Sequence, residues 1–195
     1  MNLPIYNQTK KFVIDSFNQA GKPDQIKHLL RTAYWLKKLR PSADEALLVS
    51  AIAHDIERAF RQKDMLKKLA ESGSTNIGFY RLHEERGVEI MADFLIKQKV
   101  NSDFIKKVKG LISRHEEGGN DDQNLLKDAD SVSFFENNAC FFIDKAIEED
   151  KKQRTKQKFD WMFNRITSEK AKQIARPLYK KAVKALNARV FLTKP

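Results

Sequence analysis

The sequence has few of the residues that break helices or form tight turns. Seven glycines and five prolines are spread over 195 residues, and apolar residues recur at helical spacing along most of the chain. There is no alternating strand pattern, no internal repeat and no linker long enough to separate domains. We therefore predict an all-α fold with one domain over residues 1–195. Helix starts are predicted at Ser42 and Ser102.

Cysteine and long apolar runs are also scarce. The single Cys140 excludes a disulfide within the chain and fits a reducing compartment. Its neighbours Ala139 and Phe141 predict a buried packing thiol rather than a nucleophile. No apolar run approaches the length of a membrane span, and the first residues resemble neither a signal peptide nor a transit peptide. These features predict a cytoplasmic protein.

Positive charge is concentrated in the last quarter of the chain. From Lys145 to Pro195 there are 15 Lys and Arg residues against 5 Asp and Glu residues, whereas the first 144 residues carry 22 against 21. We expect basic helices over residues 145–190 that pack on the rest of the bundle through their apolar positions. Their outer surface could bind nucleic acid or another polyanion, or it could simply be solvated.

All four histidines lie near the ends of expected helices. His28 and His83 begin apolar stripes with helical spacing, whereas His54 and His115 end such stripes. In successive antiparallel helices, the start of one lies beside the end of the next. The four imidazoles are therefore predicted to gather at one end of the bundle.

Two carboxylates and two small residues complete this predicted cluster. Asp55 follows His54 directly, and a loop over residues 116–125 can bring Asp130 back to the same end. The small residues Ala51 and Gly87 let helices approach closely there. Imidazoles and carboxylates without thiolates favour Mn²⁺ or iron, with Mg²⁺, Co²⁺ or Ni²⁺ as alternatives.

This ordered set resembles the HD-domain metal-dependent phosphohydrolases, a helical superfamily named for its His-Asp doublet. The resemblance covers residues 25–136 approximately. It rests on three segments, Lys27-His28-Leu29-Leu30-Arg31, Ala51-Ile52-Ala53-His54-Asp55 and Asp128-Ala129-Asp130-Ser131-Val132. It implies an HD-type helical bundle that binds two divalent metal ions per chain, with Asp55 as the bridging ligand. The implied metal ligands are His28, His54, Asp55, His83, His115 and Asp130.

The resemblance also implies a reaction. Two divalent ions lower the pKa of bound water, and the resulting hydroxide attacks a phosphoester. The expected substrate is a nucleotide or a related small phosphorylated metabolite. Arg58, one turn after His54, could bind its phosphate, while Glu57 could orient a ligand or donate a proton to the leaving group; these two residues could equally form a surface pair. Asp55, Glu57 and Arg58 are thus the predicted catalytic residues.

Several alternatives remain open from the sequence. Glu116 could position a ligand or water, or it could be a solvated loop carboxylate. Asp128 is expected either to support the ligands or to face solvent. Some members of the superfamily resemble this ligand set but are diiron oxygenases. A third alternative is a non-enzymatic protein whose basic C-terminal helices bind nucleic acid or a partner.

Overall fold

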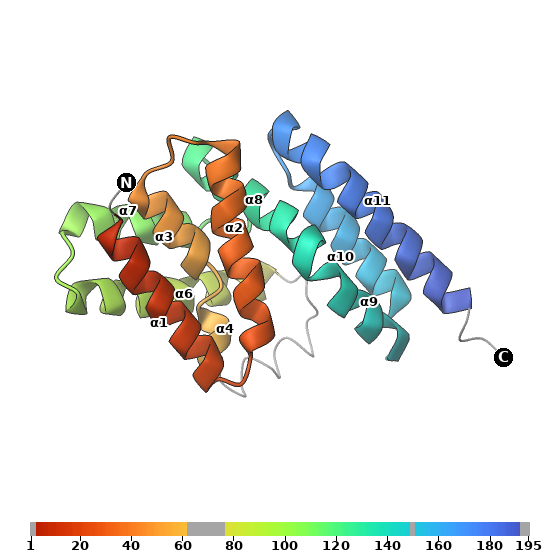
Figure 1. Ribbon diagram of the computed structural model, residues 1–195, viewed down its shortest axis with the longest axis horizontal. Helices are drawn as coiled ribbons and strands as arrows, with labels where there is room; N and C mark the ends of the chain where they lie inside the picture. Colours follow the sequence, from red (N-terminus) through yellow and green to blue (C-terminus); the bar gives the residue numbers. More distant parts are fainter. Residues whose placement is uncertain (1–2, 62–76, 149–150, 192–195) are drawn as a thin grey trace.

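Helices form nearly all of the structure. The computed structural model describes residues 3–61, 77–148 and 151–191 (Figure 1), and these ranges contain no strand. The predicted all-α fold is therefore confirmed. None of the described helices is both long and apolar enough to cross a membrane. The helices are α1 (Pro4–Gln19), α2 (Ile26–Leu39), α3 (Glu45–Ala53), α4 (Glu57–Phe60), α6 (Ile77–Lys97), α7 (Ser102–Ile112), α8 (Asp121–Asn137), α9 (Ala139–Glu148), α10 (Lys152–Asn164) and α11 (Glu169–Phe191), and a 3₁₀ turn covers Pro23–Gln25.

Helix α8 joins two groups of helices. On one side it packs against α2 and on the other against α11, and Figure 1 shows α9, α10 and α11 side by side beyond it. Its residues Leu126 and Ala129 belong to an apolar core shared with α1, α2, α3, α6 and α7. Its residues Val132, Phe134 and Phe135 belong to a second core shared with α9, α10 and α11. The basic C-terminal helices thus pack on the bundle through an apolar face.

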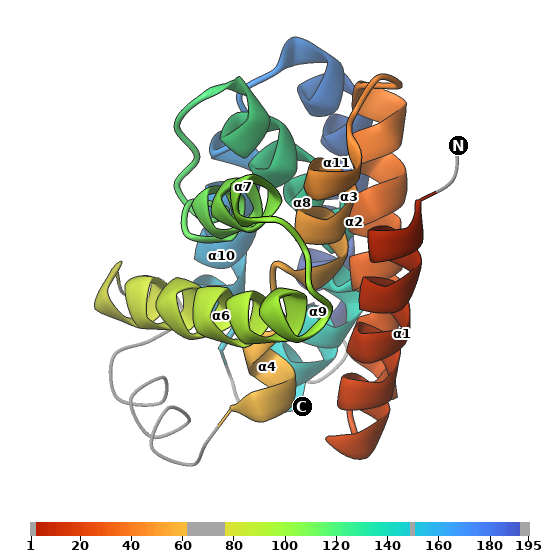
Figure 2. The same ribbon diagram turned by 90° about the vertical axis from the view of Figure 1, so that its left-hand side faces the viewer.

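Helix α1 precedes the residues that carry the family resemblance, yet it is part of the bundle. It lies alongside α2 (Figure 2) and packs against α3. Val13 and Phe17 of α1 are fully buried in the first core. Burial of large apolar side chains is the main stabilising contribution to a helical bundle, so the folded unit extends beyond residues 25–136 at both ends.

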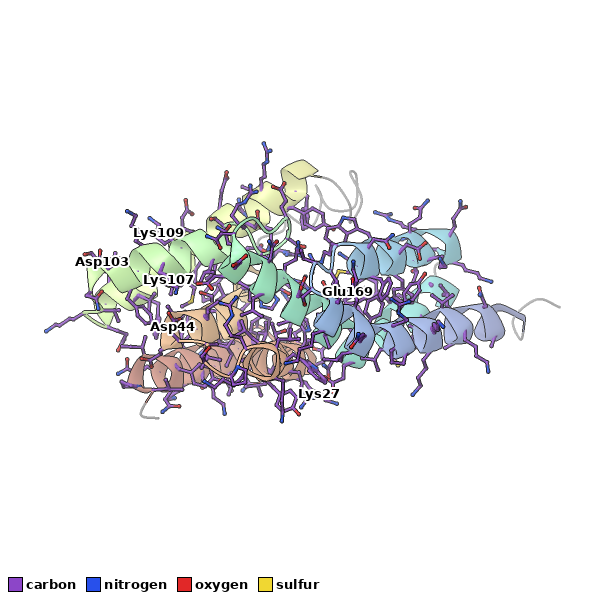
Figure 3. All side chains as sticks on the ribbon, turned by 90° about the horizontal axis from the view of Figure 1, so that it is seen from above. Lys27, Asp44, Asp103, Lys107, Lys109 and Glu169 are labelled. Carbon is purple, nitrogen blue, oxygen red and sulfur yellow. The ribbon has the colours of Figure 1, made fainter. Side chains whose placement is uncertain are left out.

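Two of the helix starts lie close to their predicted positions but use other residues as caps. Asp44, not Ser42, accepts a hydrogen bond from the backbone N–H of Leu47 at the start of α3. Asn101, not Ser102, caps α7 in the same way. The Lys107 ammonium of α7 pairs with Asp44 at 2.7 Å, and both side chains lie on the surface seen in Figure 3. An aspartate or asparagine is as good a cap as serine, so the sequence pattern leaves the start uncertain by one or two residues.

Cys140 is exposed, so the prediction that it is a buried packing thiol is wrong. The buried positions of α9 are Ala139, Ile143 and Ala146, which follow a helical period. Cys140 lies one residue off this period and therefore points outward.

The turn between α7 and α8 connects His115, which follows α7, to the helix that contains Asp130. Gly118 has a φ of +81° in this turn. A Cβ on Gly118 would also collide with the Asn124 side chain and approach Lys127 Nζ to 2.7 Å. Asn120 and Gln123 then form a reciprocal capping box at the start of α8. Glycine is required here for both conformation and space.

Replacing Gly118 with alanine is expected to lower the free energy of unfolding by about 1–2 kcal/mol, because an L-residue is disfavoured at positive φ. Urea denaturation followed by circular dichroism measures this change. Gly110→Ala in α7 is the control, since a Cβ there meets nothing within 4 Å; it should stabilise the protein by about 0.5–1 kcal/mol. Equal effects of the two substitutions would contradict the assigned turn.

Candidate metal centre

The four histidine rings form one buried cluster. His54 is the C-cap of α3, His28 lies near the start of α2, His83 lies near the start of α6, and His115 follows α7. Ring centroids are 5.4 Å apart for His28 and His54, 5.1 Å for His54 and His115, and 5.4 Å for His83 and His115. All four side chains are almost completely buried. The structure therefore brings together the residues that the sequence placed at alternating helix ends.

The Asp55 carboxylate lies between two pairs of histidines. Its Oδ2 is 3.6 Å from His54 Nε2 and 3.9 Å from His28 Nε2. Its Oδ1 is 2.9 Å from His83 Nε2 and 3.9 Å from His115 Nε2. Each pair and the carboxylate offer ligand atoms within 4.8 Å of one another. Two groups of residues could thus hold a metal ion, and Asp55 belongs to both.

Asp130 joins the first of these groups. It lies in the middle of α8, which begins at Asp121, so the loop expected over residues 116–125 ends earlier than predicted. Its Oδ1 is 3.0 Å from His28 Nε2 and 3.4 Å from His54 Nε2. The carboxylate therefore faces the side of the cluster that His28 and His54 form.

Hydrogen bonds at Nδ1 orient two of the rings. His54 Nδ1 donates to the Ala51 carbonyl at 2.9 Å, and His115 Nδ1 donates to the Ile112 carbonyl at 2.8 Å. Carbonyl oxygens only accept, so each Nδ1 carries a proton and each Nε2 faces the cluster. These two Nε2 atoms are buried without a hydrogen-bond partner in the described structure. Such atoms are rare in proteins, and a metal ion would satisfy them.

The other two rings are oriented by side chains. Ser133 Oγ donates to the His28 backbone carbonyl at 2.8 Å, so the same oxygen accepts from His28 Nδ1 at 2.9 Å. Glu57 Oε2 accepts from His83 Nδ1 at 2.7 Å. All four rings thus present Nε2 to the centre.

The pKa values of His54 and Asp55 indicate negative charge beside His54, whereas burial lowers the pKa of His115 to about 4. Burial by itself lowers the pKa of His54, but Asp55 and Asp130 outweigh it and raise the pKa to about 9. Burial raises the pKa of the Asp55 carboxyl, yet Arg58 and His54 hold it well below its usual range. At neutral pH the carboxylates are ionised and attract positive charge, which is the condition for binding a cation.

Glu57 forms hydrogen bonds with both His83 and Arg61. Burial raises the pKa of Glu57, but hydrogen bonds from His83 and Arg61 lower it to about 2. Both carboxylate oxygens accept from Arg61 Nε at 3.0 Å. An ionised carboxylate has no proton to donate, so the geometry favours the predicted orienting role over the proton-donor and surface-pair alternatives.

Arg58 lies at the edge of the cluster, with 32% of its side chain exposed, and it pairs with Asp55 rather than with Glu57. Its Nε is 3.0 Å from Asp55 Oδ2. Among the described residues no other carboxylate pairs with it, so its two Nη groups can donate to a ligand.

Arg165 is a site residue that the sequence did not reveal. It follows α10, and its guanidinium contacts Asp130 Oδ2 and Glu116 Oε2 and donates to Ser131 Oγ at 2.9 Å. Glu116 is buried by this contact, so the alternative of a solvated loop carboxylate is wrong. One arginine thus connects the C-terminal helices to both sides of the cluster.

Asp128 braces the turn that carries Arg165. It is buried, and it accepts hydrogen bonds from the backbone N–H groups of Thr167 at 2.7 Å and Ser168 at 2.8 Å. It points away from Asp130, as expected for residues two apart in a helix. Its hydrogen bonds go to this turn rather than to the ligand side chains, and the solvent-facing alternative is wrong because Asp128 is buried.

A cavity of about 240 Å³ adjoins the histidine cluster. His28, His83 and Asp130 line the end beside the cluster. The cationic side chains that line the cavity are Arg58, Arg61, Lys145, Lys158 and Arg165. Its aromatic wall includes Phe79 of α6 together with Phe141 and Phe142 of α9. The cavity thus combines positive charge with apolar ring surface.

One protein family matches residues 9–186, and it is described as "Domain of unknown function (DUF4202)". The chain belongs to this family. No curated protein and no solved structure matches the chain. The DUF4202 match runs from α1 to α11, so the family unit includes Arg165 and Lys158 as well as the histidines.

Asp128→Ala is expected to destabilise this DUF4202 protein by about 1–3 kcal/mol, since it leaves two backbone N–H groups at the start of α11 without an acceptor. Urea denaturation measures the loss. Asp103→Ala serves as the matched control, because Asp103 is exposed in the first turn of α7 and its removal should cost about 0.5 kcal/mol at most. Comparable losses for the two variants would contradict the bracing role.

Proposed function

We propose that this DUF4202 protein is a metal-dependent phosphohydrolase that cleaves a phosphoester of a nucleotide or a related small phosphorylated metabolite. The observation that carries the proposal is the position of Asp55, whose two oxygens each face a different pair of histidine Nε2 atoms. A carboxylate in this position suits two metal ions that share it as a ligand. The resemblance to the HD-domain phosphohydrolases supports the same reading.

The residues suit a hydrolytic site without a serine or cysteine nucleophile. His28, His54 and Asp130 would hold one ion, and His83 and His115 the other, with Asp55 between them. Divalent metal ions bound there would supply Lewis acidity and an activated water. A site of histidines and carboxylates without thiolate suits Mn²⁺ or iron.

The cavity supports a phosphorylated substrate with a planar ring. Arg58 can donate from its free Nη groups to phosphate oxygens in the bidentate manner that guanidinium favours. Phe79, Phe141 and Phe142 offer ring faces on which a nucleobase can stack. Because these groups lie beside the cluster, the phosphate can reach the ligand residues while the ring stays on the aromatic wall.

Metal content and activity test the proposal together. After anaerobic reloading with Mn²⁺ or Fe²⁺, we expect about two ions per chain by elemental analysis, and fewer in His83→Ala. The loaded protein should release phosphate or nucleoside from a phosphoester panel, and Asp55→Ala should abolish the release because both ions lose a ligand.

A fully loaded protein that leaves the whole panel intact would contradict hydrolysis. The diiron oxygenase alternative would then be tested by O₂ uptake, which should occur with Fe²⁺ and not with Mn²⁺. His54→Ala should also lower the metal content. It removes a ligand on the opposite side of Asp55 from His83, so it checks the site independently.

Glu57→Gln is expected to weaken metal binding about tenfold or more, because a neutral amide orients His83 less firmly than a carboxylate does. Competition with a chromophoric chelator measures the affinity. Glu85→Gln, an exposed residue of α6, removes the same charge and should leave the affinity unchanged. If the two variants bind metal alike, Glu57 does not position a ligand.

A further inference from the structure

Lys158 brings a buried ammonium group to the wall of the cavity. The residue lies in α10 and is 9% exposed. Its Nζ donates to Tyr80 Oη at 3.2 Å and lies 4.3 Å from the centroid of the Trp161 ring. Within the part of the chain that the structure describes, no carboxylate forms an ion pair with it. An ammonium has three N–H groups to satisfy, and the aromatic rings only partly compensate for lost water.

The three arginines of the cavity wall differ from Lys158. Arg58 pairs with Asp55, Arg61 with Glu57, and Arg165 with Asp130 and Glu116. Burial of a charge without a counter-ion is costly. Lys158 is such a charge, and it lies at the cavity wall, where an anionic ligand could serve as its counter-ion.

We propose that the cavity contains a phosphate-binding site in which Lys158 Nζ donates charge-assisted hydrogen bonds to a phosphate group, alongside Arg58. The ligand class is a phosphate dianion, either free or as part of a phosphomonoester. Identifying this group with the phosphate of the hydrolysed substrate rests on the proposed function, whereas the site itself does not. Lys158 thereby becomes a substrate-binding residue supplied by the C-terminal helices.

The charge state of Lys158 makes the proposal testable by pH. Burial lowers the pKa of Lys158 to about 8; among its neighbours Glu116 and Asp130 raise it, while Arg165 and Arg58 lower it further. The remaining titratable group in contact is Tyr80, whose pKa is raised mainly by burial. A bound dianion favours the ammonium form, so phosphate binding should weaken as the pH rises above 8 and the free protein loses this proton.

Titration of metal-free protein with inorganic phosphate, in the presence of a chelator, tests the site directly. We expect Lys158→Met to weaken binding about tenfold or more, since charge-assisted hydrogen bonds are the strong ones. The unfolding temperature should not fall, because methionine fills a similar volume without a buried charge.

The Lys158→Arg variant should retain phosphate binding. Its phosphate affinity should no longer weaken above pH 8, because guanidinium stays protonated. Sulfate is a dianion throughout this range. The same pH series with sulfate therefore distinguishes titration of Lys158 from titration of the phosphate itself.

Lys156→Met is the matched control, because it removes one positive charge from the same helix at an ion pair with Asp160; it should leave phosphate affinity unchanged. Metal-free protein that does not bind phosphate, or Lys158→Met that binds it like the parent, would overturn the proposal. The proposed hydrolase activity and the proposed phosphate site can also be refuted independently of each other. Lys158-dependent phosphate binding without hydrolysis by the metal-loaded protein refutes only the hydrolase, whereas hydrolysis with kcat/KM unchanged in Lys158→Met refutes only the role of Lys158 in binding the substrate phosphate.

Discussion

Buried negative charge is the constraint on which the rest of this structure depends. Asp55 and Asp130 lie inside the helical bundle, almost without exposure to solvent. Isolation of a carboxylate from water costs several kcal/mol unless it is paired and hydrogen-bonded. Arg58 and Arg165 supply two of the required partners, and the histidine rings supply the others. The helix ends place histidines beside these two carboxylates, and the C-terminal helices place Arg165 beside Asp130.

This constraint explains why the C-terminal helices are part of the same folded unit. Arg165 comes from the turn after α10, yet it is the residue that pairs with Asp130 and Glu116. Asp128 holds the following backbone in place through Thr167 and Ser168. Two aspartates of one helix therefore perform different tasks. Asp130 faces the cluster, while Asp128, on another side of α8, holds the turn that delivers the guanidinium.

The sequence was sufficient for the parts of the site that follow helical periodicity. The histidines lie at the ends of apolar stripes, so their convergence could be predicted from spacing alone. Arg165 and Lys158 could not be found in this way, because they are two of 15 basic residues in the last 51 positions and no local pattern distinguishes them. Only tertiary packing shows that they point inward. Cys140 is the opposite case, since its apolar neighbours predicted burial, but it lies outside the helical period of the buried residues Ala139 and Ile143 and is exposed.

The proton arrangement of the histidines connects the fold to its proposed chemistry. Each ring has an acceptor for its Nδ1 proton from its own helix end or from a packed neighbour. A histidine whose role was structural would also need a partner for Nε2, but at His54 and His115 the described structure provides none. The raised pKa of His54 shows that the surrounding carboxylates attract a proton in the absence of another cation. A divalent ion would compete with that proton for the same lone pair. Metal binding should therefore release protons, and its affinity should rise with pH until the imidazoles are neutral.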